Sequence, residues 1–376
     1  TGPLGQGFGT GIGMAIAEAH LQARLGSSLV DHRTFGFVSD GDLMEGISAE
    51  TASLAGHLGL GNLVYFYDDN DISIDGSTDI TFSEDVRGRF EAVGWHVLDV
   101  DGHDRPAIAE ATEAAIADAE RPSLVICRTH IGHGSPNKQD TASSHGSPLG
   151  DEEIRLTKEA IGLPPDEHFF VPDGVYDFFS ASMQRGRDSH DAWMRRRDDA
   201  LADPATADTW NAFFGDDPVA FDDPGFETGS SMATRASSGK LFGQIADKAQ
   251  NVIGGAADLV GSTKTIIDSG RLFSKTDRAA RDIAFGIREH AMGTIVNGMA
   301  VHGGLRPYGA TFFVFSDYMR GAVRLAALSE AKVVWSWSHD SVGLGEDGPT
   351  HQPIEHLMAL RAMPGLRIVR PADANE

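Results

Sequence analysis

The first third of the chain alternates between two spacings of apolar side chains. Four stretches carry apolar residues three or four positions apart, the spacing of one face of an α-helix, at 12–25, 47–58, 83–93 and 105–119. Between them, short continuous apolar runs predict buried strands at 34–38, 63–67, 95–100 and 124–128. Because helices and strands alternate, we predict right-handed crossovers and a parallel sheet with helices on both faces.

A second alternating unit follows in the last third of the chain. Its predicted helices are 238–250, 289–301, 317–328 and 352–361, and its predicted strands are 252–256, 310–315, 332–337 and 366–369. Between the two units the pattern dissolves into Pro-, Asp- and Arg-rich sequence, which is typical of a linker. We therefore predict an α/β protein with two doubly wound parallel-sheet domains, 1–162 and 231–376, joined by a linker at 163–230.

Composition and charge exclude several classes of protein. A chain of 376 residues with 41% hydrophobic content is long enough for two or three domains with real cores, so it is neither disordered nor a small disulfide-stapled scaffold. Its 55 acidic and 31 basic residues give a formal charge of −24, which repels phosphate backbones and anionic membranes. We therefore expect no nucleic acid and no membrane as partner. The single cysteine, Cys127, fits a reducing cytosol, and we expect a cytoplasmic protein.

Acidic and amide side chains follow two neighbouring predicted strands. Asp40 and Gly41 follow the strand at 34–38, and Asn70 follows the strand at 63–67. The carboxyl ends of parallel strands lie side by side, where open α/β sheets bind ligands. Asp40 and Asn70 could share a hard cation such as Mg²⁺, while Gly41 would let the backbone approach a diphosphate. Either loop alone could equally be a turn or a helix cap, but their pairing favours a metal site.

Two ionisable residues, Glu289 and His290, open the predicted helix at 289–301. The rest of that helix is rich in Ala, Met, Ile and Val, so at least one of the two should be half-buried, with a perturbed pKa. The alternative is an ordinary carboxylate at a helix N-terminus, stabilised by the helix dipole.

Three further features are compatible either with a binding site or with ordinary structure. The segment 339–353 follows a strand and is rich in glycine and polar donors, which is typical of a binding loop but also of a turn and a capped helix. Phe312, Phe315 and Tyr318 lie three apart at a strand-to-helix junction, a pattern more often found in a core. The stretch 132–146 is longer than a simple turn and could close over phosphates.

In this order along the chain, these segments resemble the transketolases, a family of thiamine diphosphate enzymes. The motifs that carry the resemblance are TGPLGQG from Thr1, SDGDLMEG from Ser39, SAETASLAGHLGLGNL from Ser48, DDNDISIDG from Asp68, IGHGSPNK from Ile131, SHGSPLG from Ser144, GIREHAMG from Gly286, RPYGATFFVFSDY from Arg306 and HDSVGLGEDGPTHQP from His339. One such motif is unspecific, but the ordered series is specific. The resemblance implies two thiamine diphosphate-binding domains, the first for the diphosphate and the second for the pyrimidine.

The resemblance implies a set of cofactor-binding residues. Asp40, Asn70 and the backbone carbonyl of Ile72 would hold Mg²⁺, or Ca²⁺ or Mn²⁺ in its place, and the metal would hold the diphosphate. Glu289 would hydrogen-bond the aminopyrimidine N1′ and promote the imino tautomer that removes the thiazolium C2 proton to form the ylid. The other residues placed at the cofactor are Gly2, Leu4, Gly41, Ile74, His145, Asp258, Phe312, Phe315 and Tyr318.

The resemblance also implies an activity, the reversible transfer of a two-carbon ketol unit from a ketose phosphate to an aldose phosphate in the pentose phosphate pathway or the Calvin cycle. Arg235, Ser262 and His339 would contact the substrate phosphate, Asp347 a hydroxyl beside the reacting carbon, and His351 the carbonyl under attack. A guanidinium and an imidazole suit phosphate, and a carboxylate accepts a hydrogen bond from a hydroxyl. The expected catalytic residues are Glu289, His351 and His145.

Similar enzymes are homodimers in which the first domain of one subunit and the second domain of its partner enclose each cofactor. Glu45 stands in the position of the acidic contact between the two sites. The chain departs from the family in two places. Ser39 replaces a usual glycine, which should be tolerated if its φ is negative. The chain also begins with Thr1 instead of Met and ends at Glu376 inside the second domain, so we expect a fragment of a longer protein.

Two kinds of alternative stay open at this point. Dihydroxyacetone synthase and deoxyxylulose-phosphate synthase-like enzymes share the GEDGPTHQP motif, although DDNDISIDG favours transketolase. From a different class, the chain could be a cofactor-binding fragment without turnover. A ketol-transfer assay with and without thiamine diphosphate distinguishes these alternatives.

Overall fold

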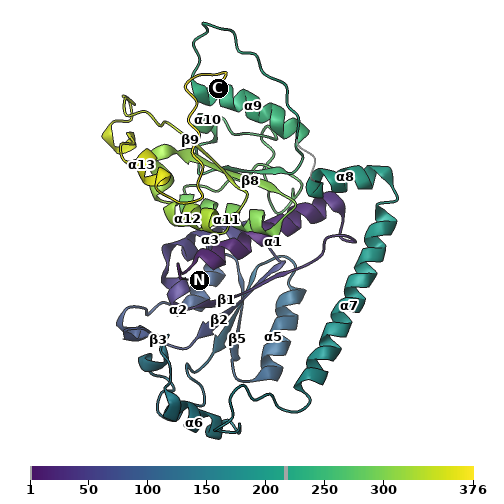
Figure 1. Ribbon diagram of the computed structural model, residues 1–376, viewed down its shortest axis with the longest axis vertical. Coiled ribbons are helices and arrows are strands. Elements are labelled where there is room, and N and C mark those ends of the chain that lie inside the picture. The colour runs from purple at the N-terminus through teal and green to yellow at the C-terminus, as the bar shows by residue number, and fades with distance from the viewer. Residues whose placement is uncertain (1, 216–218) are drawn as a thin grey trace.

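The computed structural model describes residues 2–215 and 219–376, which form two α/β units (Figure 1). Thr1 of the opening motif and residues 216–218 of the predicted linker lie outside the described residues. Helices α1 (Gln6–Leu25), α3 (Gly46–Leu58) and α11 (Glu289–His302) lie between the sheets of the two units.

Four parallel strands form the sheet of the first unit, in the order β1-β2-β6-β5. They are β1 (Thr34–Ser39), β2 (Leu63–Asp69), β5 (His96–Asp101) and β6 (Ser123–Arg128). Successive side chains of a strand point to opposite faces. Tyr65 of β2 therefore packs in the core shared with α1 and α3, while its neighbour Val64 packs against Ala111 of α5 (Arg105–Ala117) on the other face. Helices cover both faces, as predicted.

The register of this sheet brings the two polar strand ends together. Ser39 of β1 pairs with Asp68 of β2. Asp40 lies one residue beyond this pair and Asn70 lies two residues beyond it, at the same edge of the sheet. This confirms the predicted adjacency of the two loops. The remaining elements of the first unit are α2 (Asp40–Met44), the antiparallel pair β3 (Ile72–Ser73) and β4 (Gly76–Ser77), η1 (Thr78–Ile80), α4 (Val86–Ala92), η2 (Ala142–Ser144) and α6 (Asp151–Ala160).

Three parallel strands form the second sheet, in the order β7-β8-β9. The elements of this unit are α9 (Thr234–Lys248), β7 (Val252–Ala256), α10 (Val260–Thr263), β8 (Arg306–Phe312), η3 (Phe313–Asp317), α12 (Arg320–Leu328), β9 (Val334–Ser338), η4 (Pro349–His351) and α13 (His356–Arg361). The predicted strand at 366–369 was wrong, because this segment has no strand partner among the described residues. Leu366 and Ile368 do pack against the core, so the apolar run reflects burial of side chains and not pairing of the backbone.

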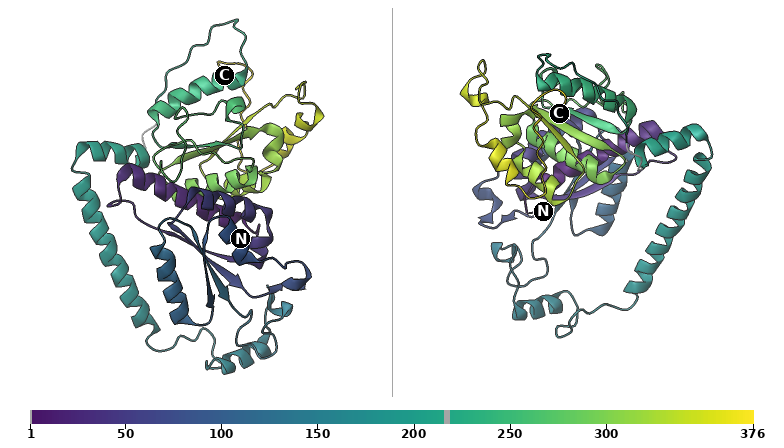
Figure 2. Two further views of the ribbon diagram at one scale, coloured as in Figure 1. Left: turned by 180° about the vertical axis from the view of Figure 1, so that it is seen from behind. Right: turned by 45° about the horizontal axis from the view of Figure 1, so that its top comes forward.

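The segment predicted as a linker contains two helices, α7 (Val175–Ala200) and α8 (Pro204–Phe214). Figure 2 shows α7 running along the outside of the first unit. None of its residues is buried, which explains why it lacks the apolar periodicity of a helix. The domain boundaries remain a prediction. Within the described parts of the chain, no helix has both the length and the apolar character needed to cross a bilayer.

Two glycines let α1 and α11 pack at close range. A Cβ added at Gly13 would lie 2.1 Å from the carbonyl oxygen of Ile295, and one added at Gly298 would lie 2.0 Å from that of Thr10. Near their starts, the two helices meet again through the side chains of Gln6 and His290. The contact between Gln6 and His290 lies before the contact at Gly13 and Gly298 in both helices. The helices therefore run in the same direction, and their N-termini lie side by side.

Candidate functional site

Asp40 is a buried carboxylate at the tip of β1. It is the first residue of α2 and is 3% exposed. The Tyr67 hydroxyl donates a hydrogen bond to Oδ1, and the backbone N–H of Asn70 faces the same carboxylate. The other oxygen, Oδ2, is buried without a hydrogen-bond partner among the described residues. Burial raises the pKa of Asp40 above its ordinary value. An unpaired buried carboxylate oxygen is costly, and a bound cation would satisfy it.

The second loop supplies oxygen atoms beside this carboxylate. Asn70 accepts a hydrogen bond from the backbone N–H of Ile72 at 3.1 Å through Oδ1, while its Nδ2 donates to Asp68 at 3.1 Å. The carboxylate of Asp40, the amide oxygen of Asn70 and the carbonyl of Ile72 form a set of hard oxygen donors. The residues present therefore fit the magnesium ion that the family resemblance implies.

The tip of β1 is tied to the start of α1 by a second aspartate. Asp42 accepts from the backbone N–H of Ser39 at 3.0 Å and from that of Gly5 at 2.9 Å. Ser39 has a φ of −124°, so the serine is accommodated without strain, as expected. Leu4 lies over Gly41, where an added Cβ would come within 2.9 Å of Leu4 Cδ1. The missing side chain keeps the first turn of α2 open under Leu4.

Glu289 is the first residue of α11 and is 8% exposed. Burial raises its pKa, and the negative charge of Glu50 raises it further. Burial also lowers the pKa of the adjacent His290, whose ring contacts Gln6. This confirms the prediction of a buried ionisable group with a perturbed pKa at this helix start. The alternative interpretation, an ordinary carboxylate at a helix N-terminus, predicts the same position for Glu289. The feature that separates the two interpretations is burial, because an ordinary carboxylate at a helix start is exposed.

Sequence reasoning did not single out Glu50 of α3. Its Oε2 accepts a hydrogen bond from the backbone N–H of Ala291 at 3.0 Å, in the first turn of α11. It thus places a second carboxylate next to Glu289, across the contact between the two units. The available signal was an acidic residue within an otherwise small and apolar helix, SAETASLAGHL.

Rings from three segments gather at the end of β8. Phe312 and Phe315 have ring centroids 5.8 Å apart and nearly parallel planes, and Phe312 stacks on His339 at 3.8 Å. His351 meets the edge of Phe315 at 5.4 Å. Tyr318 lies 6.1 Å from Phe315 and is 68% exposed, so it is not a core residue. The structure therefore brings the predicted pyrimidine-stacking rings and two predicted substrate residues into one cluster.

Two further residues predicted to bind phosphate, Arg235 and Ser262, meet His339 at the same place. Arg235 Nη1 lies 3.4 Å from Nε2 of His339 and donates to the backbone carbonyl of Ser262 at 3.3 Å. Partial burial and the guanidinium of Arg235 lower the pKa of His339. A cavity of 540 Å³ opens here, lined in part by Arg235, Ser338 and His339. Arg235 supplies a positive charge to the lining of this pocket, and Asp340 supplies a negative charge.

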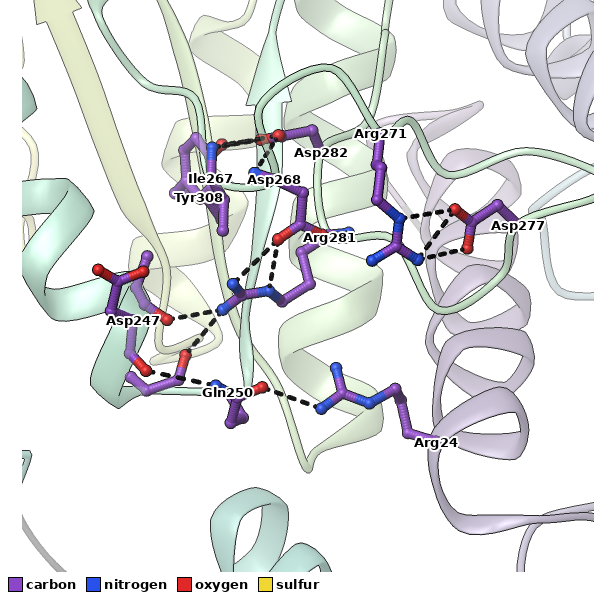
Figure 3. A network of polar contacts seen from close by, with 12 residues as sticks. Arg24, Asp247, Gln250, Ile267, Asp268, Arg271, Asp277, Arg281, Asp282 and Tyr308 are labelled. Carbon is purple, nitrogen blue, oxygen red and sulfur yellow. Dashed lines mark hydrogen bonds and ion pairs between the residues drawn. The ribbon is translucent and has the colours of Figure 1, made fainter.

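A buried polar network fixes the segment between Ser262 and Glu289 (Figure 3). Arg281 pairs with Asp268 at 3.0 Å and also donates to backbone carbonyls at the end of α9. Asp282 accepts from the backbone N–H of Asp268 at 2.7 Å, and burial raises the pKa of Asp282. The network holds the segment that leads from the phosphate cluster to Glu289.

The other predicted site residues stand apart from these clusters. Asp347 is exposed, but its charge acts on His339. His145 has a buried Nδ1 without a hydrogen-bond partner among the described residues. Gly2, Glu45, Ile74 and Asp258 are exposed. Among the described residues, no hydrogen bond, ion pair or ring contact joins Asp40 or Asn70 to Glu289 or to the aromatic cluster. Within the described residues of one chain, Asp40 and Asn70 therefore make no direct contact with Glu289 or with the aromatic cluster.

Comparison with known families gives two matches. Residues 1–211 match the family described as "Transketolase, thiamine diphosphate binding domain", and residues 230–376 match "Transketolase, pyrimidine binding domain". The mixed α/β fold with parallel sheets matches these two domains.

Individual relatives agree with these matches. A transketolase of Halalkalibacterium halodurans is 50% identical over the whole chain. The structure of a transketolase from Leishmania mexicana superposes with a TM-score of 0.95 at 41% identity. A transketolase from Pichia stipitis in complex with sedoheptulose 7-phosphate superposes with a TM-score of 0.92 at 40% identity. The chain spans 58%, 57% and 57% of these proteins, respectively.

Proposed function

This chain belongs to the transketolase family, and we propose that the protein of which it is part transfers a two-carbon ketol unit from a ketose phosphate to an aldose phosphate. The observation that carries the proposal is the cluster at the end of β8. It joins Phe312, which would face a cofactor ring, to His339, which stacks on Phe312 and touches Arg235. Stacking and phosphate-binding groups thus adjoin within one continuous set of contacts.

We infer that thiamine diphosphate and a divalent cation, Mg²⁺ or in its place Ca²⁺ or Mn²⁺, are the cofactors. Bound thiamine diphosphate would supply a carbon nucleophile that attacks the ketose carbonyl. Asp40, Asn70 and the carbonyl of Ile72 would hold the cation, and the orphaned Oδ2 of Asp40 supports that assignment. Glu289 has a raised pKa, so its carboxyl group holds a proton at higher pH than an exposed glutamate and suits proton exchange with the cofactor.

The remaining predicted residues would bind and orient. Phe312, Phe315 and Tyr318 would stack around the pyrimidine. Gly41 would approach the diphosphate, and Leu4, which lies over Gly41, would flank the thiazolium. Arg235, Ser262 and His339 would bind the substrate phosphate, with His351 beside them. Asp347 would accept from a sugar hydroxyl. The other residues assigned to the cofactor are Gly2, Ile74, His145 and Asp258.

We expect Arg235→Ala to weaken phosphorylated donors far more than unphosphorylated ones. A charge-assisted hydrogen bond to phosphate contributes roughly 1.5 to 3 kcal/mol, which corresponds to roughly a 10- to 150-fold change in kcat/KM. The measurement is kcat/KM for a ketose phosphate and for its unphosphorylated analogue, with Arg361→Ala as the matched control on the exposed surface of α13. Equal losses for the two donor types would assign Arg235 a structural role instead.

We further infer a homodimer in which each cofactor lies between the first unit of one subunit and the second unit of the other. Two observations support it. Among the described residues of one chain, Asp40 and Asn70 make no direct contact with Glu289 or with the aromatic cluster. In addition, the described residues include large apolar side chains that lie exposed on the surface of one chain, among them Ile74, Ile287, Tyr318 and Met358. Glu45, also exposed, would lie at the contact between the two sites.

If the sites are shared, thiamine diphosphate with Mg²⁺ should bind only to dimers and should shift a dilute sample toward them by mass action. Sedimentation velocity at falling protein concentration, with and without both ligands, measures this shift. A monomer that binds the cofactor as tightly as the dimer does would contradict the shared site.

The proposed activity is tested by ketol transfer from xylulose 5-phosphate, a ligand of one solved Pichia stipitis transketolase. We expect turnover that needs both thiamine diphosphate and Mg²⁺. With a five-carbon aldose phosphate as acceptor it should yield sedoheptulose 7-phosphate and release a three-carbon aldose phosphate from the donor. The relatives described above are transketolases, which favours this reaction over dihydroxyacetone synthase or deoxyxylulose-phosphate synthase. Cofactor binding without turnover would instead identify a binding fragment.

Ketol transfer of this kind would place the protein in the pentose phosphate pathway, and the single cysteine supports a cytoplasmic location.

A further inference from the structure

The start of α11, where Glu289 lies, packs beside the end of strand β8. Residues 303–305 connect the helix to the strand. A Cβ added at Gly309 of β8 would lie 3.2 Å from Cγ of Met292, which is in the first turn of α11. The strand thus meets the beginning of the helix after a short connection from the helix end. The two elements therefore run in opposite directions, and Gly309 marks the face of the strand that α11 covers.

Thr311 lies on that same face of β8. Side chains two residues apart in a strand point to one face, so Thr311 points as Gly309 does. From Gly309 to Thr311 the strand advances about 6.6 Å, and from Met292 back to Glu289 the helix covers about 4.5 Å in the same direction. Residues three apart in a helix share a face. This register places Thr311 opposite Glu289, and in the structure its hydroxyl faces the Glu289 carboxyl.

The hydroxyl of Thr311 is buried and unpaired. Thr311 is 0% exposed, and its Oγ1 has no hydrogen-bond partner within the described parts of the chain. A buried hydroxyl without a partner is unfavourable, whereas a valine of the same shape would carry no such cost. A rotation of the Glu289 side chain toward Thr311 completes a hydrogen bond between them, and this bond would satisfy the hydroxyl.

The charged and titratable neighbours of Glu289 do not orient its carboxyl. Glu50 of α3 carries the same charge and repels it. Arg288 donates instead to a backbone carbonyl and to a serine hydroxyl of α3. His290 contacts a glutamine of α1. Among the described residues, the side chain that offers the Glu289 carboxyl a hydrogen-bond donor is therefore that of Thr311.

We propose that Thr311 is a positioning residue, whose hydroxyl donates a hydrogen bond to the Glu289 carboxylate and holds it in one rotamer. The inference rests on the proposed function, because this carboxyl is the group assigned to proton exchange with the cofactor. Thr311 directly precedes Phe312 of the aromatic cluster. The end of β8 thus supplies both a ring for the pyrimidine and the hydrogen bond that orients Glu289.

Thr311→Val and Thr311→Ser separate the two halves of the threonine side chain, because valine keeps its shape without the hydroxyl and serine keeps the hydroxyl without the methyl group. The first measurement is a pH titration of Glu289 in the cofactor-free protein by ¹³C NMR of labelled glutamate carboxyl groups. The Glu289 resonance is the one that disappears in Glu289→Gln. A hydrogen bond to the charged form lowers the pKa of a carboxyl group, so the titration midpoint in Thr311→Val should move up by about one pH unit. Thr311→Ser should titrate like the parent.

The second measurement is the exchange of the C2 proton of bound thiamine diphosphate, beside the dissociation constant of the cofactor. We expect Thr311→Val to slow exchange about 10-fold or more with little change in the dissociation constant, because a catalytic group that is poorly oriented costs rate and not binding. Thr311→Ser should restore most of the rate.

The matched control is Thr294→Val. Thr294 is also fully buried, and its hydroxyl donates to the backbone carbonyl of Ala291 at 3.1 Å within α11. This variant should leave the Glu289 titration unchanged. The proposal is overturned if Thr311→Val titrates like the parent, or if Thr311→Ser shifts the midpoint as far as Thr311→Val does. The titration needs neither cofactor nor turnover, so its result stands even if the protein proves to have no ketol transfer activity.

Discussion

Replacement of Glu289 by glutamine is expected to slow the exchange of the C2 proton of bound thiamine diphosphate at least ~100-fold, the lower range of general acid–base contributions. Glutamine has the size of glutamate, so the packing at the start of α11 should persist and most of the cofactor affinity with it. The amide, however, cannot take up or release a proton. Binding and chemistry should therefore separate in this variant.

The measurement is proton–deuterium exchange at C2, followed by NMR after rapid acid quenching, beside a calorimetric dissociation constant for the cofactor. Glu110→Gln is the matched control, because Glu110 is an exposed residue on the far helix α5. If exchange in Glu289→Gln stayed within a few-fold of the parent, Glu289 would be an ordinary helix-start carboxylate. Loss of cofactor binding together with exchange would instead show that its role is positional.

The alternation of apolar runs and helical spacings is sufficient to predict both sheets and the meeting of their polar ends. A parallel strand buried on both faces is apolar along most of its length, so the apolar runs of β2 and β6 are easily recognised in the sequence. The parallel register of β1 and β2 places Ser39 beside Asp68. The candidate metal site depends on this register, because it brings the loops after β1 and β2 together. The order of strands and polar loops along the chain is therefore sufficient to predict that Asp40 lies near Asn70.

Elements that are not held in place by a buried apolar face cannot be predicted from the spacing of apolar residues. Helix α7 buries none of its residues and attaches through Trp193, whose Nε1 donates to the carbonyl of Leu29 at 2.9 Å. With little surface to bury, it shows no apolar stripe, and its Asp- and Arg-rich sequence is equally typical of a linker. The five-residue helix α2 escapes prediction for a related reason, because the side chain of Asp42 caps its start and Gly41 suggests a turn.

Tertiary neighbours also decide which polar residues matter. Glu50 and Ala291 are far apart in the sequence, and their contact arises only because α3 packs against α11. The same holds for Arg235 and His339, which the residues alone could not connect and which only the family resemblance placed together. Local pattern thus reveals the strand ends that offer ligands, while packing between units determines which side chains share a site.

Asp40→Asn is expected to preserve the stability of the metal-free protein while it weakens the binding of Mg²⁺ and thiamine diphosphate. Burial raises the pKa of Asp40 in the folded state above its value in the unfolded chain, so the folded state holds this proton more tightly. The free energy of unfolding of the metal-free protein should therefore fall as pH rises from the ordinary aspartate range through the raised pKa. Asparagine carries no such charge, so above that pH the metal-free variant should be at least as stable as the parent.

The same substitution should weaken Mg²⁺ and thiamine diphosphate together. It removes the negative charge that would balance the cation, whose own charge balances the diphosphate, and the loss should be at least about 10-fold. Thermal unfolding at neutral pH, with and without both ligands, measures both effects, and Asp173→Asn is the exposed control. The parent and the control should gain stability from the ligands by mass action, whereas Asp40→Asn should gain little. A variant that gained as much as the parent would mean that Oδ2 of Asp40 is not a metal ligand, and that its buried charge serves only the local structure of α2.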